Sequence, residues 1–397
     1  MNAIKILCVL AVCAMCIPAM GADIKAGPAT LFKINSPSKD YSAAARAKII
    51  QENIDKVLLS AEVPALRLEE RPDKSMVLWS GNFKIGDVLK EDAAKNGVTV
   101  AEEGANWIKA IKAAYGNYVN KNLKFILSSD IHNCHIEWYG VSTDIRMRQW
   151  VKAITMEQNR GKTDALFLVG DYALDYWFNG GSYNKGTSNT KAFFDKYVKA
   201  LPNAIPVYPV AGNHEQYTNA KWKEITGFDR FYTVNMGNCM FIMLDAFADE
   251  LGPDYDHDGK YVNHNVAYIK SMLAKYPAKN VFLVSHWFEK SKESDEFKQL
   301  VASEPRIRCM FCGHDHNYQV DITGDEWGNK PIIHTGEFSY AGAVEAKDDV
   351  CWGYRVLRVG MDGTVSTEYV VPAHNVLPDG TRKLVPEKTL GKWSKKY

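Results

Sequence analysis

Seven short apolar runs, each bounded by polar turns, form the main pattern of residues 123–337. A continuous apolar run of this length is typical of a strand buried on both faces of a sheet. Between them, apolar residues recur at i, i+3, i+4 and i+7 over residues 147–154 and 194–201, which predicts two helices that each cover a sheet with one face. The pattern therefore predicts an α/β domain. The runs are LKFILSSD, ALFLVGD, IPVYPVAGNH, CMFIMLD, VFLVSH, IRCMFCGH and PIIHTGE.

The chain on either side of these runs shows weaker patterns. Downstream, YRVLRV and VSTEYVV flank MDGT and predict a closing hairpin, after which residues 372–397 form a predicted C-terminal tail. Upstream, residues 23–120 combine two amphipathic helices, around Ile54 and Ile111, with a hairpin that turns at residues 71–74. We expect a small N-terminal α+β region there, which either packs as a cap on the larger domain or binds a substrate or partner.

The first 22 residues have the pattern of a secretory signal peptide. Lys5 precedes a 12-residue apolar stretch, Ile6–Ile17, and small residues follow up to Ala22. This stretch is too short to span a bilayer. Val12 and Met15 are unfavourable before an acylated cysteine, so we expect ordinary cleavage near Ala22 instead of a lipoprotein anchor. The mature protein is then expected in the periplasm or outside the cell, without a transmembrane segment.

The balance of charge argues against a polyanionic partner. The chain has 48 basic and 47 acidic residues, and removal of the signal peptide, which contains one basic residue and no acid, leaves 47 of each. Neither nucleic-acid binding nor attraction to an anionic membrane is therefore expected.

Five cysteines lie beyond the signal peptide, at positions 134, 239, 309, 312 and 351, so at least one is unpaired or pairs between chains. Cys309 and Cys312 form a CxxC motif, which in other settings holds zinc or a redox disulfide. Here the motif lies in an apolar run, and the chain has no second CxxC after the signal peptide. We interpret both residues as part of a buried strand.

Five of the apolar runs end in residue types that bind metal ions. These residues are Asp130 and His132, Asp171, Asn213 and His214, His286, and His314 and His316. The five segments are spaced by 41, 42, 73 and 28 residues, about one or two βα units each. Open α/β sheets place their sites at the carboxyl ends of strands, so we expect these side chains to meet. Their mixture of carboxylates, imidazoles and an amide suits two divalent cations about 3.5–4 Å apart, whereas structural zinc sites favour cysteines.

This ordered set of motifs resembles the calcineurin-like metallophosphoesterase superfamily, which includes purple acid phosphatases, acid sphingomyelinases and bacterial phosphodiesterases. The resemblance covers about residues 121–371 and implies a four-layer αββα sandwich. It places Asp130, His132 and His316 on one metal ion, Asn213, His286 and His314 on the other, and Asp171 between them. His214 is implied to face the substrate phosphate and to assist the leaving group.

The resemblance implies a phosphoesterase that cleaves a phosphodiester or a phosphomonoester by attack of a hydroxide held between two metal ions. Leu174 stands where purple acid phosphatases carry an iron-binding tyrosine, so Zn, Mn or Fe(II) is expected in place of ferric iron. The substrate would be a small-molecule, lipid or nucleotide phosphoester. The alternative is a non-catalytic binding scaffold with this fold; such proteins tend to lose ligands, and none is missing here.

Aromatic residues lie beside several candidate ligands. Tyr172, Trp177, Trp287 and Tyr318 belong either to the core or to the wall of the site, and we interpret them as pocket wall because strand ends open toward solvent. On this interpretation the enzyme prefers a diester or a monoester with an aromatic or sugar leaving group.

One acidic loop offers a further cation site. Asp254, Asp256, Asp258 and Gly259 match positions 1, 3, 5 and 6 of a calcium loop, but position 12 is Asn265 in place of the bidentate glutamate. The segment is therefore either a calcium site or a solvated acidic loop.

Overall fold

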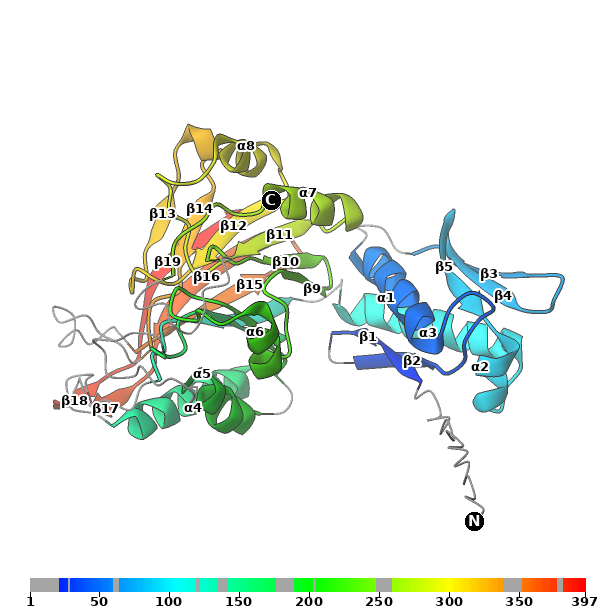
Figure 1. Cartoon of the computed structure of the whole chain (residues 1–397), viewed down its shortest axis with the longest axis horizontal. Helices are drawn as coiled ribbons and strands as arrows, with labels where there is room; N and C mark the ends of the chain where they lie inside the picture. The colour runs from blue at the N-terminus through cyan, green and yellow to red at the C-terminus, as the bar shows by residue number, and fades with distance from the viewer. Residues whose placement is uncertain are drawn as a thin grey trace, which may run out of the picture. The chain divides into compact units, whose positions relative to one another are not determined.

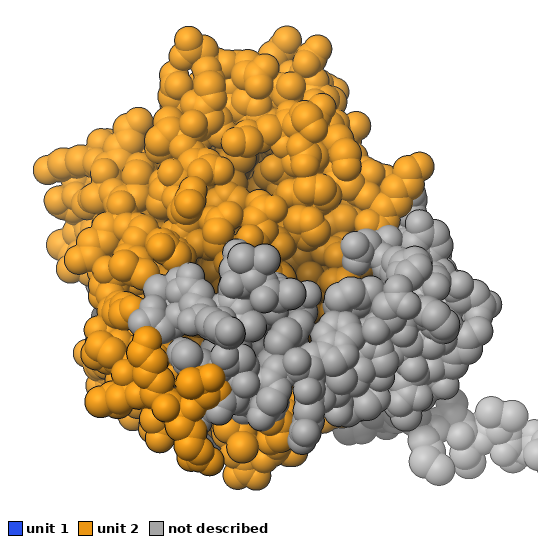
Figure 2. Space-filling model, turned by 90° about the vertical axis from the view of Figure 1, so that its left-hand side faces the viewer, with its two compact units in different colours: residues 1–25, 29–54, 65–111 blue, residues 26–28, 55–64, 112–397 orange. Residues whose placement is uncertain are grey.

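The computed structural model divides the chain into two units. Unit 1 comprises residues 1–25, 29–54 and 65–111, and unit 2, orange in Figure 2, comprises residues 26–28, 55–64 and 112–397. Among the residues that the structure describes, no helix is both long and apolar enough to cross a membrane. The described residues are 21–27, 29–59, 64–118, 122–133, 142–175, 189–202, 205–247, 259–338, 352–376 and 381–397.

The N-terminal region is a small α+β assembly, as predicted. Its strands are β1 (Ala22–Ala26), which pairs with β2 (Ala29–Ile34), and the antiparallel β3 (Leu66–Glu70), β4 (Met76–Ser80) and β5 (Phe83–Val88). Its helices are α1 (Ala43–Leu59), α2 (Lys90–Lys95) and α3 (Val100–Tyr118) (Figure 1). Both predicted helices and the predicted hairpin are confirmed. Within unit 1, the ring of Phe32 stacks on that of Trp107 at 4.2 Å, and the Arg46–Asp92 ion pair is buried.

Two six-stranded sheets form the centre of unit 2 (Figure 1). The first has the order β13-β14-β12-β11-β10-β9, with β9 (Tyr232–Met236), β10 (Cys239–Met243), β11 (Asn280–Val284), β12 (Ile307–Cys312), β13 (Val320–Ile322) and β14 (Pro331–His334). The second has the order β19-β16-β15-β6-β7-β8, with β6 (Leu123–Ser128), β7 (Ala165–Val169), β8 (Val207–Val210), β15 (Tyr354–Val359), β16 (Thr364–Val371) and β19 (Lys388–Lys396). The seven apolar runs are strands, as predicted, and β15 and β16 form the predicted closing hairpin.

Helices cover the outer face of each sheet. Apolar residues of α4 (Thr143–Arg160) and α6 (Asn219–Thr226) pack on the second sheet, and those of α7 (Val266–Lys275) and α8 (Asp295–Ser303) pack on the first. A third apolar cluster, which includes Phe167 and Phe241, fills the space between the sheets. The predicted four-layer αββα sandwich is therefore confirmed.

The predicted helix over residues 194–201 is present but irregular. α5 (Asn189–Ala192) continues into a π-helical turn, Phe193–Tyr197, and then a 3₁₀ turn, Val198–Ala200. Phe194, Tyr197 and Leu201 are buried all the same, so the apolar spacing identified the buried face correctly. A second 3₁₀ turn spans Asp325–Trp327.

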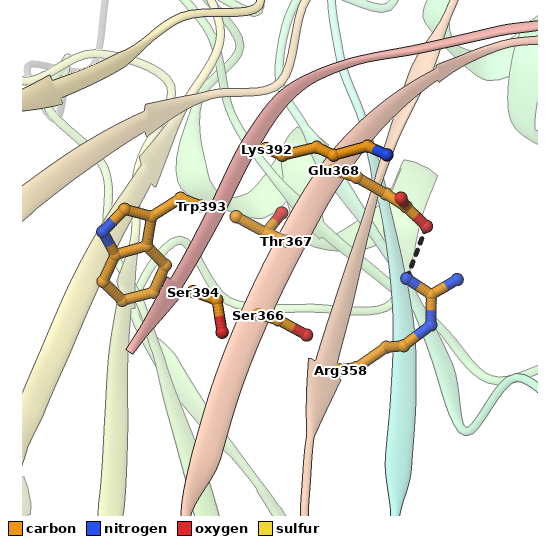
Figure 3. A pocket seen from close by; sticks show the side chains of 7 residues that line it. All are labelled: Arg358, Ser366, Thr367, Glu368, Lys392, Trp393 and Ser394. Atoms are coloured by element: carbon orange, nitrogen blue, oxygen red, sulfur yellow. Dashed lines mark hydrogen bonds and ion pairs between the residues drawn. The ribbon is translucent and has the colours of Figure 1, made fainter. Parts of the chain in front are cut away.

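The prediction that residues 372–397 form a tail is wrong. β17 (His374–Val376) pairs with β18 (Arg382–Val385), and β19 hydrogen-bonds to β16 as the edge strand of the second sheet. An edge strand buries little of itself and is often rich in lysine, which hides its strand pattern. Trp393 packs on the core between the sheets, while Lys392 and Ser394 are exposed. With Arg358 and Glu368, which form an ion pair, these residues line a surface pocket of about 240 Å³ (Figure 3).

Three cysteines lie within the described residues, and all of them are buried free thiols. Cys309 and Cys312 belong to β12, so the interpretation of the CxxC motif as buried strand is confirmed. Burial raises the pKa of both thiols well above its usual value, which makes them unreactive. Cys134, Cys351 and the predicted signal peptide up to Met20 lie outside the described residues.

Candidate metal centre

The candidate ligands follow the carboxyl ends of five strands. In the second sheet, Asp130 and His132 follow β6, Asp171 follows β7, and Asn213 and His214 follow β8; in the first sheet, His286 follows β11, and His314 and His316 follow β12. β6, β7 and β8 are parallel neighbours, and so are β11 and β12, so their ends converge at one edge of each sheet.

The structure gathers these side chains into three overlapping groups. In each group the potential ligand atoms lie within 4.8 Å of one another. The groups are Asp130 with His132 and His316, Asp171 with His286 and His314, and His132 with Asp171 and His214. Asn213 adjoins the second group, because its Oδ1 lies 3.0 Å from Nδ1 of His314.

Two buried carboxylates at the centre of the cluster have no lysine or arginine partner in the part of the chain that the structure describes. Asp130 is 0% and Asp171 is 2% exposed, and among the described residues their ion pairs are all with histidines. Burial opposes the charge of Asp171, but the histidines, His286 first, outweigh it and hold the pKa of the carboxyl well below its usual value. Burial likewise opposes a charge on His286, but Asp171 outweighs it and raises the pKa of this imidazole to about 10.

This donor set fits divalent cations. Buried carboxylates without a cationic partner are strongly destabilising, so the two aspartates require compensating positive charge. Nε2 of His286 is buried and lies 3.1 Å from Oδ2 of Asp171, without the geometry of a hydrogen bond. A metal ion between such atoms satisfies both at once, and imidazole with carboxylate is a set that transition metals favour.

The backbone at the ligand positions adopts an uncommon conformation. Seven described residues other than glycine have a positive φ, and five of them are candidate ligands. These five are Asp130 (φ 50°), His132 (φ 46°), Asp171 (φ 56°), His314 (φ 68°) and His316 (φ 52°). Left-handed conformations are disfavoured for such residues and concentrate at functional sites. The turns after β6, β7 and β12 are thus shaped to direct these side chains into the cluster.

Three glycines that directly precede a candidate ligand lie against another one. A Cβ atom on Gly170, Gly212 or Gly313 would lie 2.4 Å from His286 Nδ1, 2.1 Å from Asp171 Oδ1 or 2.4 Å from Asp130 Oδ2, respectively. These separations are too short for any side chain. Glycine at each position therefore lets neighbouring strand ends close around the two carboxylates.

Comparison with known proteins agrees with this geometry. Residues 123–318 match the model of the calcineurin-like phosphoesterase family. These residues form a calcineurin-like phosphoesterase domain. Residues 26–118 match a model described only as a domain of unknown function. No curated protein matches the chain.

Solved structures with a similar fold include two phosphatases. A dimetal phosphatase from Danio rerio is 13% identical, with a TM-score of 0.46, over 69% of this chain and 99% of that one. A purple acid phosphatase from yellow lupin, Lupinus luteus, is 13% identical, with a TM-score of 0.42, over 68% of this chain and 54% of that one.

Two acidic residues beside the candidate ligands were missed by the sequence analysis. Glu215 is buried and accepts hydrogen bonds from the backbone N–H groups of Asp171, Tyr172 and Gly212, each at 2.8 Å. Burial, followed by the charge of Asp171, raises the pKa of Glu215 to about 8. Glu337 lies with Oε2 3.6 Å from Nδ1 of His316. The signal for each was its place directly after an apolar run, in AGNHE and in PIIHTGE.

The interpretation of Tyr172 as pocket wall is wrong. Its side chain is 0% exposed, and its hydroxyl lies 2.8 Å from the carbonyl oxygen of Leu168 and 2.5 Å from that of Val210. Its ring stacks on that of Phe193 at 5.7 Å. The residue turns inward because two strand carbonyls and an apolar cluster surround it. Leu174, which stands at the position where purple acid phosphatases carry an iron-binding tyrosine, is also buried.

The other predicted substrate residues have different outcomes. Trp287 is partly exposed, and its ring centre lies 4.2 Å from that of His314, beside the candidate metal centre. Tyr318 stacks on Tyr369 at 5.4 Å, which occupies one face of its ring. For both, contact with a substrate stays a prediction.

Some predicted sites fall outside the described residues. Trp177 lies there, as do the calcium candidates Asp254, Asp256 and Asp258. Asn265, the position that departs from the calcium pattern, is described, and its side chain accepts a hydrogen bond from Tyr268 N as the N-cap of α7.

Proposed function

We propose that this calcineurin-like phosphoesterase is a dinuclear metal-dependent hydrolase of phosphoesters, located in the periplasm or outside the cell. One observation carries the proposal: two buried carboxylates, Asp130 and Asp171, are surrounded by histidines from both sheets and by no lysine or arginine among the described residues. Only bound cations balance such a site at neutral pH without protonating several imidazoles. Zn, Mn and Fe(II) suit its nitrogen and oxygen donors.

The geometry supports a definite assignment of ligands. Asp130, His132 and His316 would hold one ion, Asn213, His286 and His314 would hold the other, and Asp171 would lie between them. Asp171 fits the bridging place because its carboxylate belongs to two of the three groups. Each candidate ligand follows the end of a strand that is hydrogen-bonded within its sheet.

The chain's own residues would orient the substrate and manage the proton of the leaving group. Bound metal ions supply a Lewis acid for the phosphoryl oxygens and an activated water as nucleophile. His214 lies beside Asp171, with Nε2 3.7 Å from Oδ2, and its backbone N–H donates to Oδ1 of Asp171 at 3.2 Å. The backbone hydrogen bond to Asp171 holds His214 in place. The imidazole N–H would then donate a hydrogen bond or a proton to the leaving oxygen.

The proposed substrate is a small-molecule phosphoester, a class that includes lipid and nucleotide phosphoesters. The partly exposed Trp287 beside His314 supports a leaving group with a flat apolar part, as in an aromatic ester or a nucleoside diester. A non-catalytic scaffold with this fold is the competing proposal. It is disfavoured because no member of the candidate ligand set is replaced or displaced.

A paired assay tests the proposed function. Metal-free protein would be reconstituted with Mn²⁺ or Zn²⁺, its metal content measured by elemental analysis, and hydrolysis of nitrophenyl phosphate compared with that of bis(nitrophenyl) phosphate. We expect about two ions per chain and hydrolysis of at least one ester. Stoichiometric metal without hydrolysis of either ester would support the scaffold, and one ion or none would contradict the dinuclear site.

A further inference from the structure

A chain of buried polar residues lies outside the candidate ligand set. Nε2 of His264 lies 2.8 Å from Oγ of Ser285, while its Nδ1 hydrogen-bonds to Oε1 of Glu293. The hydroxyl of Tyr261 donates to the same Glu293 oxygen and accepts from the backbone N–H of Glu289 at 3.1 Å. Ser285, His264 and Glu293 are 0%, 3% and 5% exposed, and Tyr261 is partly exposed.

The protein holds this chain in one arrangement. The imidazole of His264 packs against the rings of Phe288 and Phe297, with centres 4.7 Å and 5.2 Å away. Pairing with the Glu293 carboxylate requires a hydrogen on Nδ1 of His264, which leaves Nε2 of the neutral ring to accept from Ser285. Buried polar groups of this kind are costly to separate, because each would lose its partner without gaining water.

Both ends of the chain reach candidate ligands of one subsite. Ser285 directly precedes His286 in the sequence. At the other end, the ring of Tyr261 lies edge-on to that of Trp287 at 5.0 Å, and Trp287 lies 4.2 Å from His314. The contacts of Tyr261, Glu293, His264 and Ser285 within the described residues do not extend to Asp130, His132 or His316.

We propose that Tyr261, Glu293 and His264 are positioning residues that set the affinity of the subsite formed by Asn213, His286 and His314, and leave the other subsite almost unaffected. The inference rests on the proposed dinuclear function. The chain orients His286 through its neighbour Ser285 and supports His314 through Trp287. Groups that orient a metal-binding histidine typically change metal affinity by about 10- to 100-fold when they are removed.

Tyr261→Phe is the most selective probe, because it removes only the hydroxyl and keeps the ring against Trp287. Tyr354→Phe is its matched control: the Tyr354 hydroxyl also donates to a buried glutamate, Glu157, at 3.0 Å, and neither residue is a candidate ligand. Trp287→Phe is a second probe, which leaves the polar chain whole and weakens the support of His314.

Metal-free protein is titrated with Mn²⁺ or Zn²⁺, and calorimetry monitors the binding steps. Elemental analysis after dialysis gives the metal content. We expect Tyr261→Phe and Trp287→Phe to weaken one of the two binding steps by about 10-fold while the other step is unchanged, and Tyr354→Phe to match the wild type. Equal weakening of both steps, or two unchanged steps in the folded Tyr261→Phe and Trp287→Phe variants, overturns the inference. A wild-type protein that shows fewer than two steps contradicts the proposed function itself, whatever the variants do.

Discussion

At the scale of single residues, the site depends on backbone positions that most side chains avoid. Asp130, Asp171 and three histidines have left-handed conformations, each of which costs about 1–3 kcal/mol. The glycines that precede the ligands remove the clash that would otherwise keep the strand ends apart. This local strain brings the metal-binding side chains together, an arrangement that packing of the core does not require.

Gly212→Ala should damage the metal centre. The new Cβ would lie 2.1 Å from Oδ1 and 2.6 Å from the backbone nitrogen of Asp171, so the Asp171 carboxylate or its strand end must move. We expect a loss of stability of about 1–3 kcal/mol and a metal affinity lowered by at least about 10-fold. Elemental analysis and thermal unfolding measure the two effects.

Gly324→Ala is the control for that substitution. Gly324 has an extended backbone with φ −75°, and nothing lies within 4 Å of a Cβ placed there. This variant should keep the wild-type metal content and stability. Full metal loading in Gly212→Ala would show that the ligand cluster tolerates the displacement and that our reading of the glycines is wrong.

His214→Ala and Asp171→Asn should separate catalysis from metal binding. His214 is assigned to the leaving group, so its replacement should keep about two ions and lower kcat by about 10²–10⁴. Asp171→Asn removes the charge that both ions would share, so the variant should lose metal and nearly all activity. Metal analysis beside kcat distinguishes the variants, and loss of metal from His214→Ala would mean that the roles are exchanged.

At the scale of secondary-structure elements, β19 ties the end of the chain to the ligand loop after β12. Arg355 of β15 is fully buried and donates to the carbonyl oxygens of His334, at 2.7 Å, Gly391, at 2.8 Å, and Tyr318. Gly391 belongs to β19, and Tyr318 follows the candidate ligand His316 by two residues. Edge pairing and one buried guanidinium thus fix a loop that carries two ligands.

Gly391→Ala should therefore destabilise the domain more than an ordinary left-handed glycine would. Gly391 has φ 50°, and a Cβ there would lie 2.2 Å from the carbonyl oxygen of Tyr318. The conformation alone costs about 1–2 kcal/mol, and the clash adds about 1–3 kcal/mol. The free energy of unfolding in urea measures the sum.

Gly227→Ala isolates the conformational part of that cost. Gly227 ends α6 with φ 83°, and nothing lies within 4 Å of a Cβ placed there. Its replacement should cost only about 1–2 kcal/mol. If the two variants lose equal stability, β19 does not press on the Tyr318 loop as the structure indicates.

At the scale of the whole molecule, metal binding and folding of the phosphoesterase domain should be coupled. The candidate ligands come from five strands of two sheets, so an unfolded chain cannot present them together. Removing metal with a chelator would leave Asp130 and Asp171 buried, with histidines as their only described ion-pair partners.

Chelation should therefore lower the Tm and abolish hydrolysis, and Mn²⁺ or Zn²⁺ should restore both. An ion present at 100 times its Kd stabilises the folded state by about 2.7 kcal/mol. Thermal unfolding of metal-free and reconstituted protein is the measurement. An unchanged Tm after complete removal of metal would show that the carboxylates are compensated in another way.

The sequence alone determined the elements of the domain and the residue types at the strand ends. Continuous apolar runs encode buried strands locally, and the ligands follow these runs directly, so neither inference needed a contact between distant residues. The α/β class and the five ligand-bearing segments could be read for that reason.

Only the tertiary structure decided which neighbouring side chains face the site. Tyr172 is next to Asp171 in the sequence, yet its side chain points into the core. There its hydroxyl donates to the carbonyl oxygen of Val210 and its ring stacks on that of Phe193. Glu215 joins three backbone N–H groups of two strand ends, and β19 finds its partner in β16. Each outcome depends on groups far away along the chain, whose positions a local pattern of polar and apolar residues does not contain.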